Sequence, residues 1–203
     1  VDALVLDAAH RFERAGAIVT TVSVPEHTTL AVDCVNLVSS AMPRNSMGMN
    51  WKGHYQIDLA EFYVKHLQDR AALFPPEMKM GLVMERMLDR TGDGLYYARA
   101  QNAALMVRAA YDKALGSQVD VLVMPTVAAR PPKLPPANVD FAASLKASDG
   151  AALNTPQFDV TGHPGLSVPC GKLDGLPIGM MIVGRIGDDA TVLRAGYAFE
   201  QLG

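Results

Sequence analysis

Two apolar runs near the end of the chain constrain its fold most strongly. They are Leu166–Val168 and Ile178–Val183, and the loop that joins them contains Gly171, Gly175 and Pro177. Two such runs joined by a short Gly/Pro loop predict neighbouring strands, which we expect to be antiparallel. The second run is apolar without alternation, which is typical of a strand covered on both faces. The sequence therefore predicts a buried central sheet and not a surface hairpin.

The residues around the first run are predicted to be turns. Asn154–Pro156 is turn-prone, and we expect a short apolar turn carrying Phe158 and Val160 to follow it. Three residues that break helices come next: Gly162, Pro164 and Gly165. Pro169 directly follows the first run and is expected to end that strand.

The Gly and Pro residues of this stretch have a long, fixed spacing. Residues 155–171 follow the pattern T-x-x-F-x-x-T-G-x-P-x-x-S-V-P-x-G, and then come G-L-P-I-G-M and G-x-x-G-D-D-A-T-V-L. This pattern resembles the C-terminal part of the amidase-signature hydrolases, which cleave carboxamides with a Ser–cis-Ser–Lys triad. The match is closest over 154–203, fair over 94–131 and loose before residue 90. The resemblance implies an α/β fold with a mixed central β-sheet covered by helices on both faces.

Composition and charge narrow the class of protein. The 203 residues are 49% hydrophobic and 19% charged, which is ordinary for one soluble domain with a core. The net charge of −3 and the absence of a basic run give no support for binding nucleic acid or an anionic membrane. Cys34 and Cys170 are far apart and in no paired-motif spacing, so a reduced, cytoplasmic setting is the simplest interpretation, and a disulfide between them is the alternative. The chain starts at Val1 inside an amphipathic pattern, and we therefore expect it to be a piece of a longer protein.

The rest of the chain alternates helical and strand-like patterns. Helices are expected over 2–15, 28–41, 57–68, from Pro75 to Gly92, over 95–115, and after the acidic pair Asp188-Asp189. Strands are expected over 17–24 and 119–124. We interpret the whole as one amidase-like domain with a helix-rich portion over 1–128, a Pro-rich strap and linker over 129–153, and a strand pair plus helix over 154–203.

No residue of this chain qualifies as catalytic. Amide hydrolysis by the family's route needs a serine nucleophile, a base and backbone N–H groups around the oxyanion. The resemblance places these in a Gly/Ser-rich segment, whereas the Ser39-Ser40 pair lies in an apolar context without glycine. The five histidines match no zinc-binding spacing, and no nucleotide-binding glycine pattern is present, so no metal or cofactor is expected.

The resemblance implies that this chain contributes to the substrate side. Trp51, in a loop rich in Gly and Asn, is expected to form a pocket wall, and Thr155 and Phe158 are expected to border the acyl pocket. The alternatives are that Trp51 pins its loop, that Phe158 is a core residue and that Thr155 caps the turn. For His163, a structural role is preferred over a role as acid or base.

The resemblance predicts part of an amidase that hydrolyses a carboxamide to an acid and ammonia, with catalytic residues upstream of residue 1. One alternative is the glutaminase subunit of a tRNA-dependent amidotransferase, and another is a non-catalytic amidase-like scaffold. The partners that follow are a small amide substrate and the missing N-terminal half of the enzyme. A homodimer stays open, and neither nucleic acid nor a membrane is expected.

Overall fold

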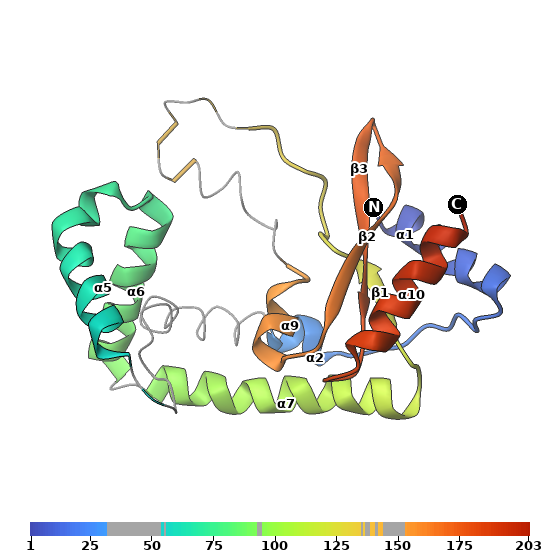
Figure 1. Cartoon of the computed structure of the whole chain (residues 1–203), viewed down its shortest axis with the longest axis horizontal. Helices are drawn as coiled ribbons and strands as arrows, with labels where there is room; N and C mark the ends of the chain where they lie inside the picture. The colour runs from blue at the N-terminus through green and yellow to red at the C-terminus, as the bar shows by residue number, and fades with distance from the viewer. Residues whose placement is uncertain are drawn as a thin grey trace. The chain divides into compact units, whose positions relative to one another are not determined.

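The structure is a computed structural model that describes residues 1–31, 54, 56–92, 95–134, 136, 139–140, 142–143 and 153–203. The chain divides into two compact units. One consists of Val1–Val32 together with Ala103–Gly203, and the other of Asp33–Asn102. None of the described helices is both long and apolar enough to cross a membrane. The strands belong to the first unit, which therefore contains the sheet and the features of functional interest (Figure 1).

A three-stranded antiparallel sheet forms the centre of the first unit. Its strands are β1 (Leu122–Pro125), β2 (Gly165–Leu173) and β3 (Leu176–Val183), in the order β1-β3-β2. The predicted antiparallel pairing of β2 with β3 is confirmed. The prediction that Pro169 ends β2 is wrong. The strand continues to Leu173 because β2 lies at the edge of the described sheet and its register shifts between Pro169 and Gly171, which tolerates a residue without an N–H.

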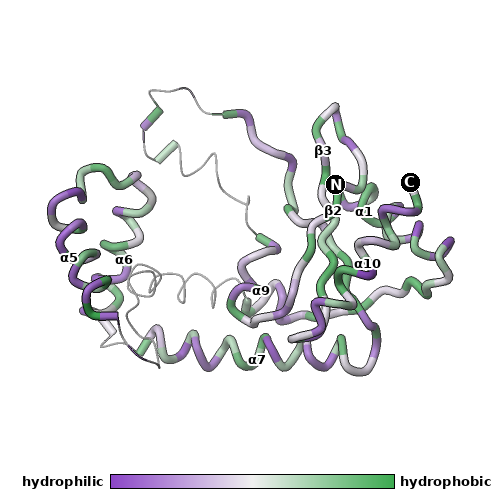
Figure 2. Tube along the Cα trace, in the orientation of Figure 1, coloured by the Kyte–Doolittle hydropathy of each residue, from purple (hydrophilic) through white to green (hydrophobic). Residues whose placement is uncertain are grey.

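Helices pack on both faces of this sheet, as expected for an α/β fold. On one face, Met180 and Ile182 of β3 contact residues of α1 (Asp2–Arg11) and α10 (Asp189–Gln201). On the other face, the next side chains along β3 pack against residues of α7 (Leu95–Ser117) and α9 (Pro156–Thr161). Figure 2 shows hydrophobic positions along the strands and a mixture of hydrophilic and hydrophobic positions along α7. The apolar run in β3 is therefore explained by burial on both sides.

The helix predictions are largely confirmed. The expected first helix consists of α1 and the 3-10 turn η1 (Phe12–Ala15), and Gly16 ends it in the left-handed conformation with φ 86°. The other long helices are α5 (Ile57–Arg70), α6 (Pro76–Gly92) and α7, and a 3-10 turn, η2 (Ala71–Leu73), follows α5. Asp188 begins α10 as expected, because its carboxylate accepts a hydrogen bond of 3.2 Å from the Thr191 N–H.

Two local predictions are wrong within the described residues, and a third can be checked only at its start. Ala17–Val24 is extended but forms no strand, because no neighbouring strand pairs with it. A short helix, α2 (Glu26–Thr29), begins before residue 28, and the rest of the helix expected over 28–41 lies almost wholly outside the described residues. The turn expected around Phe158 is the helix α9, because Pro156 suits its first position and Gly162, with φ 80°, ends it.

Candidate functional site

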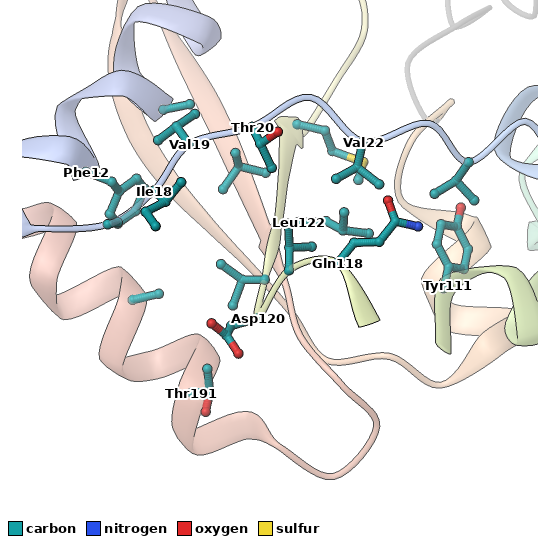
Figure 3. Close-up of a pocket in the computed structure, with 18 of the residues that line it drawn as sticks. Phe12, Ile18, Val19, Thr20, Val22, Tyr111, Gln118, Asp120, Leu122 and Thr191 are labelled. Atoms are coloured by element: carbon teal, nitrogen blue, oxygen red, sulfur yellow. The ribbon is translucent and has the colours of Figure 1, made fainter. Parts of the chain in front are cut away.

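A cavity of the first unit lies between the segment Ala17–Val24 and β1. Its volume is about 1030 Å³. Figure 3 shows Val19, Thr20 and Val22 on the side of the segment and Leu122 on the side of β1. Further walls come from α1, η1 and α10, whose residues here are Ala9, Phe12, Ala15, Thr191, Arg194, Ala195 and Ala198. Most lining residues are therefore apolar, with Thr20, Gln118 and Asp120 among the polar ones.

A chain of polar side chains closes one end of this cavity. The two ring nitrogens of His27, in α2, lie 2.6 Å from the hydroxyl oxygen of Tyr111 and 3.1 Å from Oδ1 of Asn154. Nδ2 of Asn154 donates a hydrogen bond of 2.8 Å to the carbonyl oxygen of Pro125, the last residue of β1. We call these four groups the His27 relay. It joins α2, α7, β1 and the start of α9 at one point.

The carbonyl at the end of the relay fixes the direction of the two hydrogen bonds made by Asn154. Because the Pro125 carbonyl can only accept, the Asn154 amide must present its NH₂ group to it and its oxygen to His27. That oxygen can only accept, so Nε2 of His27 carries a proton and donates it. In the neutral imidazole Nδ1 is then an acceptor, and the Tyr111 hydroxyl donates to it. Each of these polar groups thereby has a partner at the cavity wall.

Aromatic packing holds the relay in place. Tyr111 is fully buried, and its ring centroid lies 4.8 Å from that of Phe158 and 5.5 Å from that of His163. Burial, reinforced by the negative charge of Glu26, raises the pKa of the Tyr111 hydroxyl. The hydroxyl therefore stays protonated at neutral pH, as its role as donor requires.

His163 belongs to the structural support and not to the relay. Its Nδ1 lies 2.9 Å from the hydroxyl oxygen of Thr161, and its Nε2 lies 3.3 Å from a carboxylate oxygen of Asp112 without the alignment of a hydrogen bond. Burial of the ring lowers the pKa of His163, although the nearby Asp112 carboxylate opposes this effect. These contacts agree with the structural role preferred from the sequence.

The structure places two of the three predicted substrate-binding residues beside the relay. Thr155 follows Asn154 directly and precedes α9, and its side chain makes no capping hydrogen bond. Phe158 is 5% exposed and packs against Tyr111 inside the core. Trp51 lies outside the described residues, as does the Ser39-Ser40 pair.

A second cavity of about 450 Å³ lies at the start of β3, where Pro177, Ile178 and Gly179 line it. Two hydroxyls of its wall, those of Thr126 and Ser167, lie 2.6 Å apart across Gly179. A Cβ on Gly179 would lie 2.7 Å from the Ser167 hydroxyl oxygen, so any larger residue would have to displace these hydroxyls. The wall also includes Arg130, which forms an ion pair of 2.5 Å with Asp174.

Comparison with known proteins decides the family. A model of the family described as Amidase matches residues 1–193. The chain belongs to the amidase family. A protein of Rhodococcus erythropolis from the nthA 5′ region is 46% identical over 159 residues, which are 78% of this chain and 79% of that protein. The enantioselective amidase of Rhodococcus rhodochrous is 40% identical over 157 residues, which are 77% of this chain but 30% of that enzyme.

Solved structures of amidases share the fold of this chain. A peptide amidase in complex with the inhibitor chymostatin has a TM-score of 0.62 and 27% identity, over 98% of this chain and 39% of that one. A bacterial aryl acylamidase has a TM-score of 0.62 at 22% identity, which shows the fold alone. The chain thus spans about two fifths of the solved amidases that it matches.

No pattern in the sequence indicates the His27 relay. His27 is one of five histidines without a metal-binding spacing, and Tyr111 has the spacing of a buried helical residue. Only Asn154 carries a usable signal, since an Asn before a Thr-Pro turn often bonds a nearby backbone group. The partners are separated by 84 and 127 residues, so only the fold could show that they meet.

Proposed function

We propose that this chain is part of an amidase that hydrolyses a carboxamide to a carboxylic acid and ammonia. The observation that carries the proposal is the 40% identity to the enantioselective amidase of Rhodococcus rhodochrous over 157 residues. The Ser–cis-Ser–Lys residues would come from a part of the protein that precedes residue 1. The chain would supply the substrate side and work in the cytoplasm.

The region around the start of α9 is the proposed substrate side. The Thr155 hydroxyl is not used as a helix cap, so it is free to donate to a substrate carbonyl. Phe158 lies one helical turn after Thr155 and packs against the Tyr111 ring, and it would set the depth of the wall. Asn154 precedes Thr155 and is fixed by two hydrogen bonds, which would keep the wall rigid as catalysis requires. Trp51, which lies outside the described residues, is proposed as a further wall residue of the substrate pocket on its sequence alone.

A chimera would test this proposal. The residues of the Rhodococcus rhodochrous amidase that match this chain would be replaced by the chain, and ammonia release from benzamide and racemic 2-phenylpropionamide would be measured. We expect hydrolysis, with Thr155→Val raising KM and Thr155→Ser leaving it within about threefold, because serine keeps the hydroxyl. A chimera that melts cooperatively but releases no ammonia from either amide would contradict the proposal.

A second candidate is the glutaminase component of a tRNA-dependent amidotransferase. A glutamyl-tRNA(Gln) amidotransferase subunit of Syntrophomonas wolfei is 32% identical over 201 residues, and this match covers 97% of the chain. Replacing the matching residues of that subunit by this chain, in a second chimera, would distinguish the two candidates. Hydrolysis of glutamine with delivery of ammonia to Glu-tRNA favours the second candidate, and inactivity in both hosts would favour a non-catalytic scaffold.

A further inference from the structure

We infer that His27 is a positioning residue of the proposed amidase, because it fixes Thr155 through the side chain of Asn154. His27 would touch neither the substrate nor the reacting atoms. Its effect would be to hold the Thr155 hydroxyl in one direction, so that this hydroxyl meets the substrate carbonyl. The inference deepens the proposed hydrolysis of a carboxamide and rests on it, and it gives the His27 relay a role in the reaction.

The Asn154 side chain has a defined direction because its amide is held at both ends. Nδ2 donates to the Pro125 carbonyl at 2.8 Å, and Oδ1 accepts from Nε2 of His27 at 3.1 Å. The last torsion of an asparagine side chain has a broad energy minimum, so one bond would leave the amide partly free to turn. Pro125 pairs with Met180 of β3, so the first bond is fixed to the sheet. The second bond, from His27, removes the freedom that remains.

His27 takes its own position from the core of the first unit. It belongs to a helix of only four residues, which has little stability by itself. Its Nδ1 accepts from the Tyr111 hydroxyl at 2.6 Å, and the two rings meet edge to face with their centroids 6.2 Å apart. Tyr111 is fully buried in α7. The relay thus carries the rigidity of the core to Asn154 through one histidine ring.

Thr155 lies between two fixed residues. Asn154 precedes it, and the carbonyl of Thr155 accepts from the Phe158 N–H at 3.1 Å. Phe158 packs against the same Tyr111 ring, with centroids 4.8 Å apart, so Tyr111 supports both flanks of Thr155. Threonine is β-branched and stiff at χ1, and the Thr155 hydroxyl makes no capping bond. A fixed backbone at Thr155 therefore fixes the direction in which its hydroxyl points.

The alternative is that the relay only satisfies polar groups that folding has removed from water. His27 and Asn154 are partly buried at a cavity wall, where a water molecule could serve each atom almost as well as a direct bond. Water would not, however, fix the direction of the Asn154 amide. Two of the direct bonds join residues that are 84 and 127 positions apart in the sequence. Positioning explains such an arrangement better than satisfaction of polar groups alone.

Two substitutions of His27 differ in whether they keep the bond to Asn154. Glutamine reaches as far as Nε2 of histidine and keeps a donor for Asn154, whereas asparagine reaches only as far as Nδ1. In the chimera with the Rhodococcus rhodochrous amidase, we expect His27→Asn to lower kcat/KM for benzamide at least about fivefold, chiefly by raising KM. His27→Gln should keep kcat/KM within about twofold of the chimera's value.

The effect of His27 on the kinetics must pass through Thr155. In the Thr155→Val background, where the hydroxyl is absent, His27→Asn should change kcat/KM less than about twofold. A merely structural role would lower Tm in both backgrounds, and its effect on kcat/KM would not depend on the Thr155 hydroxyl. Asp188→Ala is the control, because it removes the cap of α10 without touching the relay, and it should leave kcat/KM within about twofold.

Amide hydrogen exchange follows the order of Thr155 without relying on activity. The Phe158 N–H donates to the Thr155 carbonyl, and the Gly162 N–H donates at 2.8 Å to the Phe158 carbonyl at the end of α9. We expect the Phe158 amide to exchange at least about fivefold faster in His27→Asn than in His27→Gln. Exchange at the Gly162 amide should agree between the two variants within about twofold.

An unchanged kcat/KM in His27→Asn, or a loss that is equally large without the Thr155 hydroxyl, would overturn the inference. Equal exchange of the Phe158 amide in the two variants would also overturn it. An active chimera with any of these results keeps the proposed hydrolysis and refutes only the positioning role. An inactive chimera that melts cooperatively refutes the hydrolysis, and exchange at Phe158 then decides whether His27 orders Thr155.

A third substitution serves if His27→Asn does not fold. His27→Met then takes its place, because methionine has the reach of glutamine and suits an apolar wall but cannot donate to Asn154. The same loss of kcat/KM and the same faster exchange at Phe158 are expected, and a His27→Met variant that matches His27→Gln in both measurements would overturn the inference.

Discussion

The His27 relay gives the sharpest prediction, because three side chains and one carbonyl form a single chain of hydrogen bonds. Asn154→Ala removes two bonds, of 3.1 and 2.8 Å, and Tyr111→Phe removes one, of 2.6 Å. The Phe substitution keeps the ring that packs at 4.8 Å from Phe158, so only the hydroxyl is lost. The two variants therefore break the relay from opposite sides of His27.

The magnitude follows from the number of bonds and their exposure. His27 and Asn154 are partly buried at a cavity wall, so water can replace part of each bond, and each is worth about 1 kcal/mol. We expect Asn154→Ala to reduce the free energy of unfolding by about 2 kcal/mol and Tyr111→Phe by about 1 kcal/mol. Either change removes the polarisation that the relay transmits through His27. The double variant should then lose less than the sum, by about 0.5–1 kcal/mol.

Urea unfolding followed by circular dichroism at 25 °C measures all four corners of this cycle. Asp188→Ala is the control, because it removes the helix cap of α10 at a cost of about 1 kcal/mol and shares no partner with the relay. Its effect should add to that of Asn154→Ala within about 0.5 kcal/mol. If Asn154→Ala and Tyr111→Phe are equally additive, the two bonds are independent and the relay argument is wrong.

Two further predictions concern single residues. Gly162→Ala should destabilise the fold by about 1–2 kcal/mol, because Gly162 ends α9 with φ 80° and a Cβ there meets no other atom, so only the backbone cost remains. The control is Gly116→Ala, which is equally unobstructed but lies inside α7 and should stabilise the fold by up to about 1 kcal/mol. Thermal melts in which both variants shift Tm in the same direction would contradict this prediction. Burial lowers the pKa of His163, so below about pH 6.5 the unfolded chain binds a proton that the folded chain does not bind. The free energy of unfolding therefore decreases as the pH falls. His163→Gln should reduce this loss by up to about 1 kcal/mol between pH 7.5 and 5.5 in urea titrations, and an unchanged pH slope would show that His163 does not titrate as described.

Elements with a periodic pattern and a clear end signal could be predicted from the sequence. The helix ending at Gly16 has apolar residues at helical spacing and a glycine that adopts φ 86°. The helix beginning after Asp188 has a carboxylate that caps the Thr191 N–H. The Ile178–Val183 run could be assigned to a strand covered on both faces because nothing polar interrupts it. In each case the information lies within about ten residues.

The candidate site could not be predicted in the same way, because its residues come together only through packing. His27 lies in a helix of four residues that no periodicity could reveal. Its two partners are on other elements, and each of them alone has an ordinary local role as a core tyrosine or a turn asparagine. Polar chains of this kind carry no sequence spacing, so the fold must precede their recognition.

The failed strand prediction over Ala17–Val24 has a different cause. Local preference was right, since the segment is extended and rich in β-branched residues, and what is missing is the neighbour that would complete its hydrogen bonds. Residues favour a strand through the partners that a sheet supplies, and among the described residues this segment pairs with no strand and borders a cavity of about 1030 Å³ beside β1. Its β-branched sequence therefore predicts an extended backbone, whereas a strand also needs a hydrogen-bonded neighbour, which local sequence cannot reveal.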